Sequence, residues 1–70
     1  MSEDVLAVEE ALDRLKLIDE RKAQLLDLVC FGGLTVEESA AVLHVSSATI
    51  GRDLRMARAW LQRELRLSVN

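Results

Sequence analysis

The chain has little of several residue types, and each shortage narrows the kind of protein it can be. Its 70 residues contain no proline and only three glycines, which favours helices joined by short connections. Cys30 is the only cysteine, so no disulfide can form within the chain, and its apolar neighbours predict a buried, unreactive thiol. No hydrophobic run approaches the ~20 residues of a membrane span, and the acidic start M-S-E-D is not that of a signal peptide. We therefore expect a cytoplasmic protein with no membrane partner.

Charge is divided unevenly along the chain. Residues 1–40 contain ten acidic and four basic side chains, whereas residues 41–70 contain two acidic side chains and five arginines. The overall charge of −3 therefore hides an acidic first part and a basic second part. A basic part of this kind indicates contact with nucleic acid, and the acidic part is expected to face away from it.

The spacing of hydrophobic residues predicts an all-α fold of four helices in one domain, residues 1–70, without a sheet or a winged element. Only Phe31 and Trp60 are aromatic, so the core must be built mostly from Leu, Val, Ile and Ala. Asp19 is placed to cap the second helix, and Gly32 with Gly33 to end it. The expected helices cover about residues 4–17, 20–31, 35–43 and 47–67. The clearest apolar stripe lies on the last of these and consists of Ile50, Leu54, Ala57, Leu61 and Leu65.

The segment from Thr35 to Arg55 reads as a helix-turn-helix formed by the third and fourth helices. Thr35 and Glu38 have the spacing of a capping box at the start of a short helix. Ala40 is small enough to let two helices approach, and Ser46 or Ser47 can cap the long helix that follows. This motif places its second helix in the major groove of DNA.

The start of the fourth helix supplies the candidate DNA-binding residues. Arginine can bond guanine in a bidentate manner or bind a phosphate, and hydroxyl groups near a helix N-terminus can bind phosphate. Arginines on an outer helix face can also be a solvated surface, and Gly51 can reflect either drift or a close approach to DNA. The candidates are Ser46, Ser47, Ala48, Thr49, Gly51, Arg52 and Arg55.

Other residues that could carry chemistry point to structural roles. His44 falls in the turn, and no second histidine or cysteine is present to complete a zinc site. Met56 and Trp60 are spaced to pack against the first helix, with Trp60 alternatively an anchor for a protein partner. No glycine-rich phosphate loop or set of catalytic groups is present, so we expect no enzyme activity, no metal and no cofactor.

Taken together, these motifs resemble region 4 of bacterial sigma factors, most closely the extracytoplasmic-function (ECF) group of the sigma-70 family. The resemblance covers about Ala11 to Leu65. It rests on D-E-R-K-A-Q at 19–24, F-G-G-L-T-V-E-E at 31–38, V-S-S-A-T-I at 45–50 and R-M-A-R-A-W-L at 55–61. It implies a four-helix module that reads the −35 promoter element and docks on the flap of the RNA polymerase β subunit. An anti-sigma factor is a further partner of many members.

Two departures from the family pattern qualify the resemblance. The family often has a basic residue where Gly51 stands, so one expected DNA contact is missing. The chain also has no counterpart of region 2, and we expect an excised C-terminal domain rather than a stand-alone protein. Two alternatives remain: a LuxR-type output domain, whose recognition helix is shorter, and a protein-interaction module of the transcription machinery that does not bind DNA.

Overall fold

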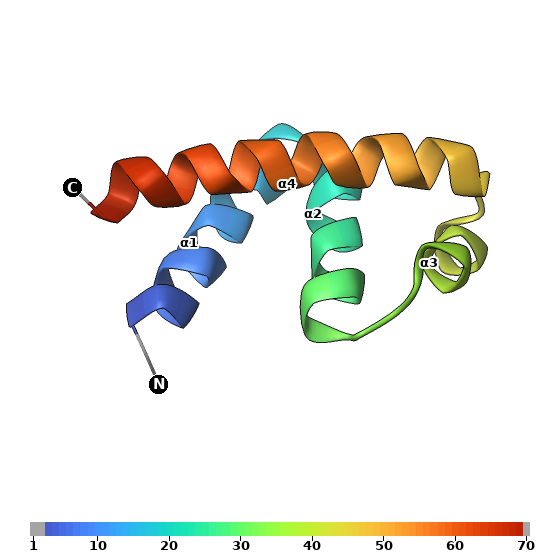
Figure 1. Ribbon diagram of the computed structural model, residues 1–70, viewed down its shortest axis with the longest axis horizontal. Helices are drawn as coiled ribbons and strands as arrows, with labels where there is room; N and C mark the ends of the chain where they lie inside the picture. The colour runs from blue at the N-terminus through green and yellow to red at the C-terminus, as the bar shows by residue number, and fades with distance from the viewer. Residues whose placement is uncertain (1–2, 70) are drawn as a thin grey trace.

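One long helix, α4, runs the length of the molecule, and the other helices lie against it (Figure 1). The computed structural model describes residues 3–69, and every regular segment in that range is helical. The expected all-α fold of four helices is thereby confirmed. The elements are α1 (Glu3–Ile18), α2 (Glu20–Leu26), the π-helical segment η1 (Asp27–Phe31), α3 (Val36–Leu43) and α4 (Ser47–Val69).

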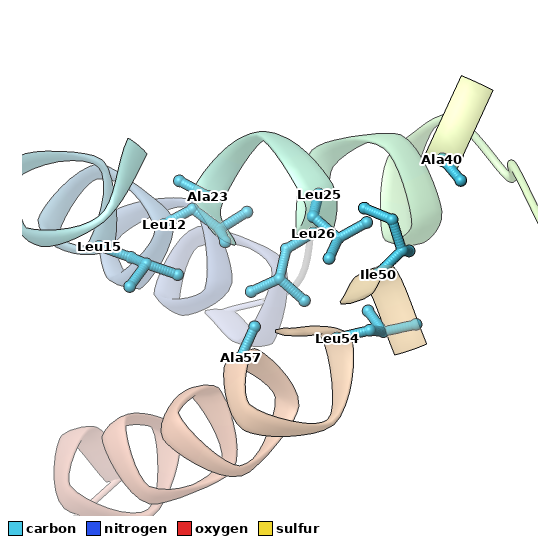
Figure 2. Packing of buried hydrophobic residues seen from close by; sticks show 9 residues of the cluster. All are labelled: Leu12, Leu15, Ala23, Leu25, Leu26, Ala40, Ile50, Leu54 and Ala57. Carbon is cyan, nitrogen blue, oxygen red and sulfur yellow. The ribbon is translucent and has the colours of Figure 1, made fainter. Parts of the chain in front are cut away.

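The core lies where α1, α2 and α3 meet α4. Figure 2 shows side chains from all four helices converging there, with Leu26, Ile50 and Ala57 fully buried. The apolar stripe predicted on α4 supplies Ile50, Leu54 and Ala57 to this core, while Leu61 packs against its edge. The buried aliphatic and alanine side chains are Ala11, Leu12, Leu15, Ala23, Leu25, Leu26, Ala40, Ile50, Leu54 and Ala57.

Short polar caps decide where the helices begin. At the start of α2, Asp19 accepts a hydrogen bond from the Lys22 backbone N–H at 3.2 Å and one from Lys22 Nζ at 2.7 Å. At the start of α3, Thr35 N donates to Glu38 Oε1 at 2.9 Å, and Glu38 N donates to Thr35 Oγ1 at 3.1 Å. Both predicted caps are therefore confirmed, including the reciprocal capping box.

The end of the second helix differs from the expectation of a regular helix through residue 31. Asp27 to Phe31 form a π-helical turn, in which Gly32 N donates to the carbonyl oxygen of Asp27 at 2.9 Å. A π turn holds more residues than an α turn, so the residues after Leu26 are rotated relative to the buried face of α2. Gly33 then leaves the helix with a left-handed φ of 69°.

The structure corrects two expectations about side chains. Cys30 is exposed rather than buried, because the wider turn carries it and Phe31 away from the core. Met56 is also exposed, contrary to the expected packing against the first helix. Trp60, one turn further along, is half-buried against the core.

The Asp19 cap predicts a specific dependence of stability on pH. Hydrogen bonds from Lys22, the side-chain bond first, lower the pKa of Asp19 below the ordinary value of an aspartate side chain. Because the folded state lowers this pKa, the stabilisation is present above about pH 4 and is lost as pH falls through the folded value. Asp19→Asn keeps a capping side chain but removes the carboxylate. We expect its deficit in melting temperature to be largest at neutral pH and to shrink in acid.

Circular dichroism melts across this pH range measure the effect. Asp13→Asn, which removes an exposed carboxyl of α1, controls for the change in net charge. A deficit for Asp19→Asn that stays constant with pH would show that the carboxylate does not provide the stabilisation.

Candidate nucleic-acid interface

The turn between α3 and α4 is tight and is set by three residues. His44 ends α3 in the left-handed conformation, with φ 58° and ψ 42°, and its backbone N–H donates to the carbonyl oxygen of Ala40. Val45 N donates to the same oxygen at 3.2 Å. Ser46 then caps α4, since its Oγ accepts from Thr49 N at 3.1 Å. The prediction that His44 is a helix-end residue is confirmed.

This cap changes what Ser46 can do. Ser46 Oγ also donates to Thr49 Oγ1 at 2.9 Å, so its hydrogen is already engaged. The hydroxyl hydrogen of Thr49 remains available to donate outward. Of the two hydroxyl candidates in the pair, Thr49 is therefore the better phosphate donor, and Ser46 is the residue that holds it in place.

Most of the predicted DNA-binding residues lie along one side of α4. Ser47, Ala48, Arg52 and Arg55 are exposed, while Gly51 is half-exposed. Four of the seven candidates border a single open hollow of about 840 Å³ between the start of α3 and the middle of α4. The hollow is lined by Val36, Ala48, Gly51, Arg52, Leu54, Arg55, Arg58, Ala59 and Gln62.

Five members of this lining were absent from the sequence candidates: Val36, Leu54, Arg58, Ala59 and Gln62. Arg58 and Gln62 continue the same side of α4, at three and seven residues after Arg55. This helical spacing could have identified both. Val36 comes from α3, and only the angle between α3 and α4 brings it to the hollow. Ser46, Ser47 and Thr49 lie outside the hollow, at the N-terminal tip of α4.

The electrostatics of α4 favour an anionic partner on this side. Within residues 5–67, no acidic side chain forms an ion pair with Arg52, Arg55 or Arg58. The two acidic residues of α4, Asp53 and Glu64, pair instead with arginines of other helices. Arg21 of α2 is 2.7 Å from Asp53, and Arg14 of α1 is 3.2 Å from Glu64. Since both acids lie on the opposite flank of α4, the hollow has a rim of three arginines and no carboxylate.

The described residues contain no alternative centre of metal chemistry. Among them, no group of three or more His, Cys, Asp or Glu side chains is placed to hold a metal ion. None of their helices is both long and apolar enough to cross a bilayer.

A capped helix, a tight turn and a long helix with an arginine face together define a helix-turn-helix domain. The chain belongs to the ECF sigma factor family, since the family model described as "ECF sigma factor" matches residues 1–67. Members of this family direct the initiation of transcription by RNA polymerase, and the family is one of transcription factors rather than enzymes. No curated protein and no solved structure gives a significant match to the chain.

A substitution at Gly51 tests whether the fold requires a glycine on this side of α4. A Cβ placed on Gly51 would meet nothing within 4 Å, so the fold itself does not require glycine there. We expect Gly51→Ala to raise the free energy of unfolding by about 1 kcal/mol, the usual difference between Gly and Ala inside a helix. Urea denaturation followed by circular dichroism measures this gain.

Gly32→Ala is the matched control. A Cβ at Gly32 would lie 2.6 Å from the carbonyl oxygen of Leu28, so this variant should lose stability. If Gly51→Ala were as destabilising as Gly32→Ala, the conclusion that Gly51 has space for a side chain would be wrong.

Proposed function

We propose that the chain is a single region 4-like domain that reads the −35 promoter element and docks on the flap of the RNA polymerase β subunit. The observation that carries the proposal is the arginine rim of the hollow on α4. Both acidic residues of α4 lie on the opposite flank, where they pair with arginines of other helices. Membership of the ECF sigma factor family supplies the promoter and the polymerase as partners.

The N-terminal half of α4 is the part that would enter the major groove. Its outward residues at positions 47, 48 and 51 are small, so the helix can approach the base edges closely. Arg52 and Arg55 are long enough to reach guanine or phosphate from this position. Thr49 would donate to a phosphate at the helix tip, where the helix dipole also favours negative charge. Arg58 extends the basic rim by one turn and would contact the phosphate backbone.

The unbroken α4 favours this function over a LuxR-type output domain. In that class a shorter recognition helix is followed by a separate dimerising helix, which would require a break near residue 58. Here α4 continues without interruption from Ser47 to Val69. The fourth helix therefore has the length expected of sigma region 4.

A second surface has the character needed for docking on polymerase. Next to η1, a wholly apolar hollow of about 290 Å³ is lined by Val5, Val8, Cys30, Phe31 and Leu61. Phe31 is 54% exposed at this hollow, so it joins the neighbouring apolar side chains in one exposed patch, and contiguous patches of this kind often mark interaction sites. Phe31 also borders a neighbouring hollow whose charged lining consists of three acids, Glu9, Asp13 and Asp27, and one base, Lys16. This surface would receive an apolar segment of the β flap that is flanked by basic residues.

DNA binding by the isolated domain should be weak and sensitive to salt. Two to four arginine contacts release few counterions, so we expect a log–log salt slope of roughly −2 to −4. Tethering through the rest of the sigma factor and polymerase would supply the remaining affinity. Electrophoretic mobility shifts with −35 promoter duplexes test the proposal. It is wrong if no salt-sensitive binding occurs at high protein concentration, either with or without polymerase.

Removing Arg52 or Arg55 should weaken DNA binding selectively. We expect Arg52→Ala and Arg55→Ala each to lower affinity for a −35 duplex by roughly tenfold and to reduce the salt slope by about 1 where a phosphate contact is lost. Fluorescence anisotropy over a salt series measures both. Lys16→Ala removes the same charge from α1 and should change neither strongly. Loss of polymerase binding instead of DNA binding would favour an interaction module that does not read DNA.

Removing Phe31 should weaken polymerase binding without affecting DNA. We expect Phe31→Ala to lower affinity for an isolated β-flap fragment by about tenfold, as for an exposed aromatic anchor of an interface. Calorimetric titration measures the change. Leu17→Ala is the matched control, because Leu17 is 89% exposed on α1 and lies outside the apolar hollow. Equal affinity of Phe31→Ala and the wild type would exclude this surface as the docking site.

A further inference from the structure

Asp53 is the one charged residue that the fold buries among the described residues. Its side chain is 8% exposed, and its Oδ2 accepts a hydrogen bond from Arg21 Nη2 at 2.7 Å. A buried carboxylate is costly unless it is paired, so this ion pair holds Asp53 in its place. Arg21 itself lies in the first turn of α2 and stays 47% exposed.

The place of Asp53 in the sequence gives this ion pair a consequence beyond stability. Asp53 lies directly between the two proposed reading residues, one position after Arg52 and two before Arg55. Successive residues of an α-helix are separated by about 100°. Fixing the direction of Asp53 toward α2 therefore also fixes the directions in which Arg52 and Arg55 leave the helix.

The apolar contacts of α4 fix its rotation about its own axis less tightly than the ion pair between Arg21 and Asp53 does. Ile50, Leu54 and Ala57 hold α4 against the core, but hydrophobic contact is non-directional and tolerates small rotations. A short hydrogen bond depends on angle as well as distance. Within the part of the chain that the structure describes, the bond from Arg21 is the one side-chain hydrogen bond between α2 and α4.

We propose that Arg21 is a positioning residue for promoter recognition. It sets the rotation of α4 through Asp53, so that Arg52 and Arg55 meet base edges at the correct angle. It also pairs with the Asp53 carboxylate on the flank of α4 that faces away from the proposed DNA surface. This inference rests on the proposed reading of DNA by α4. It gives Arg21, which lies outside the helix-turn-helix, a role in the specificity of DNA recognition.

The variants separate positioning from simple stability. Arg21→Met removes the charge and keeps an apolar stem, which leaves the Asp53 carboxylate buried without its partner. Arg21→Met combined with Asp53→Asn removes that buried charge as well and should recover much of the lost stability. Arg14→Met is the matched control, because it breaks the other ion pair to α4, at Glu64, more than two turns beyond the reading residues.

Two readouts are needed. The first is the discrimination ratio, which compares affinity for a duplex selected by the wild type from a randomised pool with affinity for an unselected duplex. The second uses amide residual dipolar couplings, measured without DNA, to give the orientation of α4 relative to α2. All measurements are made at a temperature at which circular dichroism shows each variant to be folded.

We expect Arg21→Met and the double variant both to lose about tenfold in the discrimination ratio, which corresponds to one misdirected arginine contact. Affinity for the unselected duplex should fall only as much as in Arg14→Met, whose discrimination ratio should stay at the wild-type value. The dipolar couplings of α4 should change in both Arg21 variants and not in Arg14→Met.

The outcomes that overturn the inference differ from those that overturn the proposed function. If the double variant recovers discrimination together with stability, Arg21 has only a structural role. If Arg14→Met loses as much discrimination as Arg21→Met, the effect is one of general charge. If the wild type itself does not discriminate between duplexes, the proposed reading of DNA fails, and the dipolar couplings alone then show whether Arg21 orients α4.

Discussion

The packing of three shorter helices against one face of α4 is the constraint on which the rest of this structure depends. α2 has seven residues and α3 has eight, and isolated helices of such length are not stable in water. They persist because α4 offers them a common apolar stripe, and α1 completes the core beside them. Four of the ten buried hydrophobic residues are alanines. The helices therefore pack closely, and fewer large side chains are needed to fill the core.

The same packing arranges the charges. The net charge of −3 would repel DNA if it were spread evenly, but the arginines of α4 project from the side that the core does not use. The acidic residues of the first half of the chain lie mainly on α1, α2 and the start of α3. Two arginines from that half, Arg14 and Arg21, reach back to the acids of α4. Charge is therefore sorted by helix face, and a domain with an acidic total can still present a basic surface.

The sequence predicted those features that depend on local chemistry. The caps at Asp19 and Thr35, the turn at His44 and the stripe on α4 all follow from a few neighbouring residues, and the structure confirms them. The π turn of η1 was not predicted, because a run such as L-V-C-F has no local signal that separates an α turn from a π turn. The exposure of Cys30 and Phe31 follows from that turn and was missed with it. The pairing of Arg21 with Asp53 joins positions 32 residues apart, and no pattern in one sequence indicates such a contact.

For the candidate site, the sequence identified the side of α4 but not its full extent. Ala48, Gly51, Arg52 and Arg55 do gather at one hollow, whereas Ser46 and Thr49 are partly engaged with each other. The contribution of Val36 depends on how α3 crosses α4, which is a property of the packed structure.

The absence of any break in α4 has one further consequence. Gly51 in the arginine-rimmed hollow and Leu61 in the apolar hollow are ten residues apart on α4, about 15 Å along its axis. If both surfaces are occupied as proposed, α4 sets a fixed distance between the polymerase contact and the promoter contact. Adjustment to promoters of different spacing must then come from outside this domain, for example from bending of the DNA.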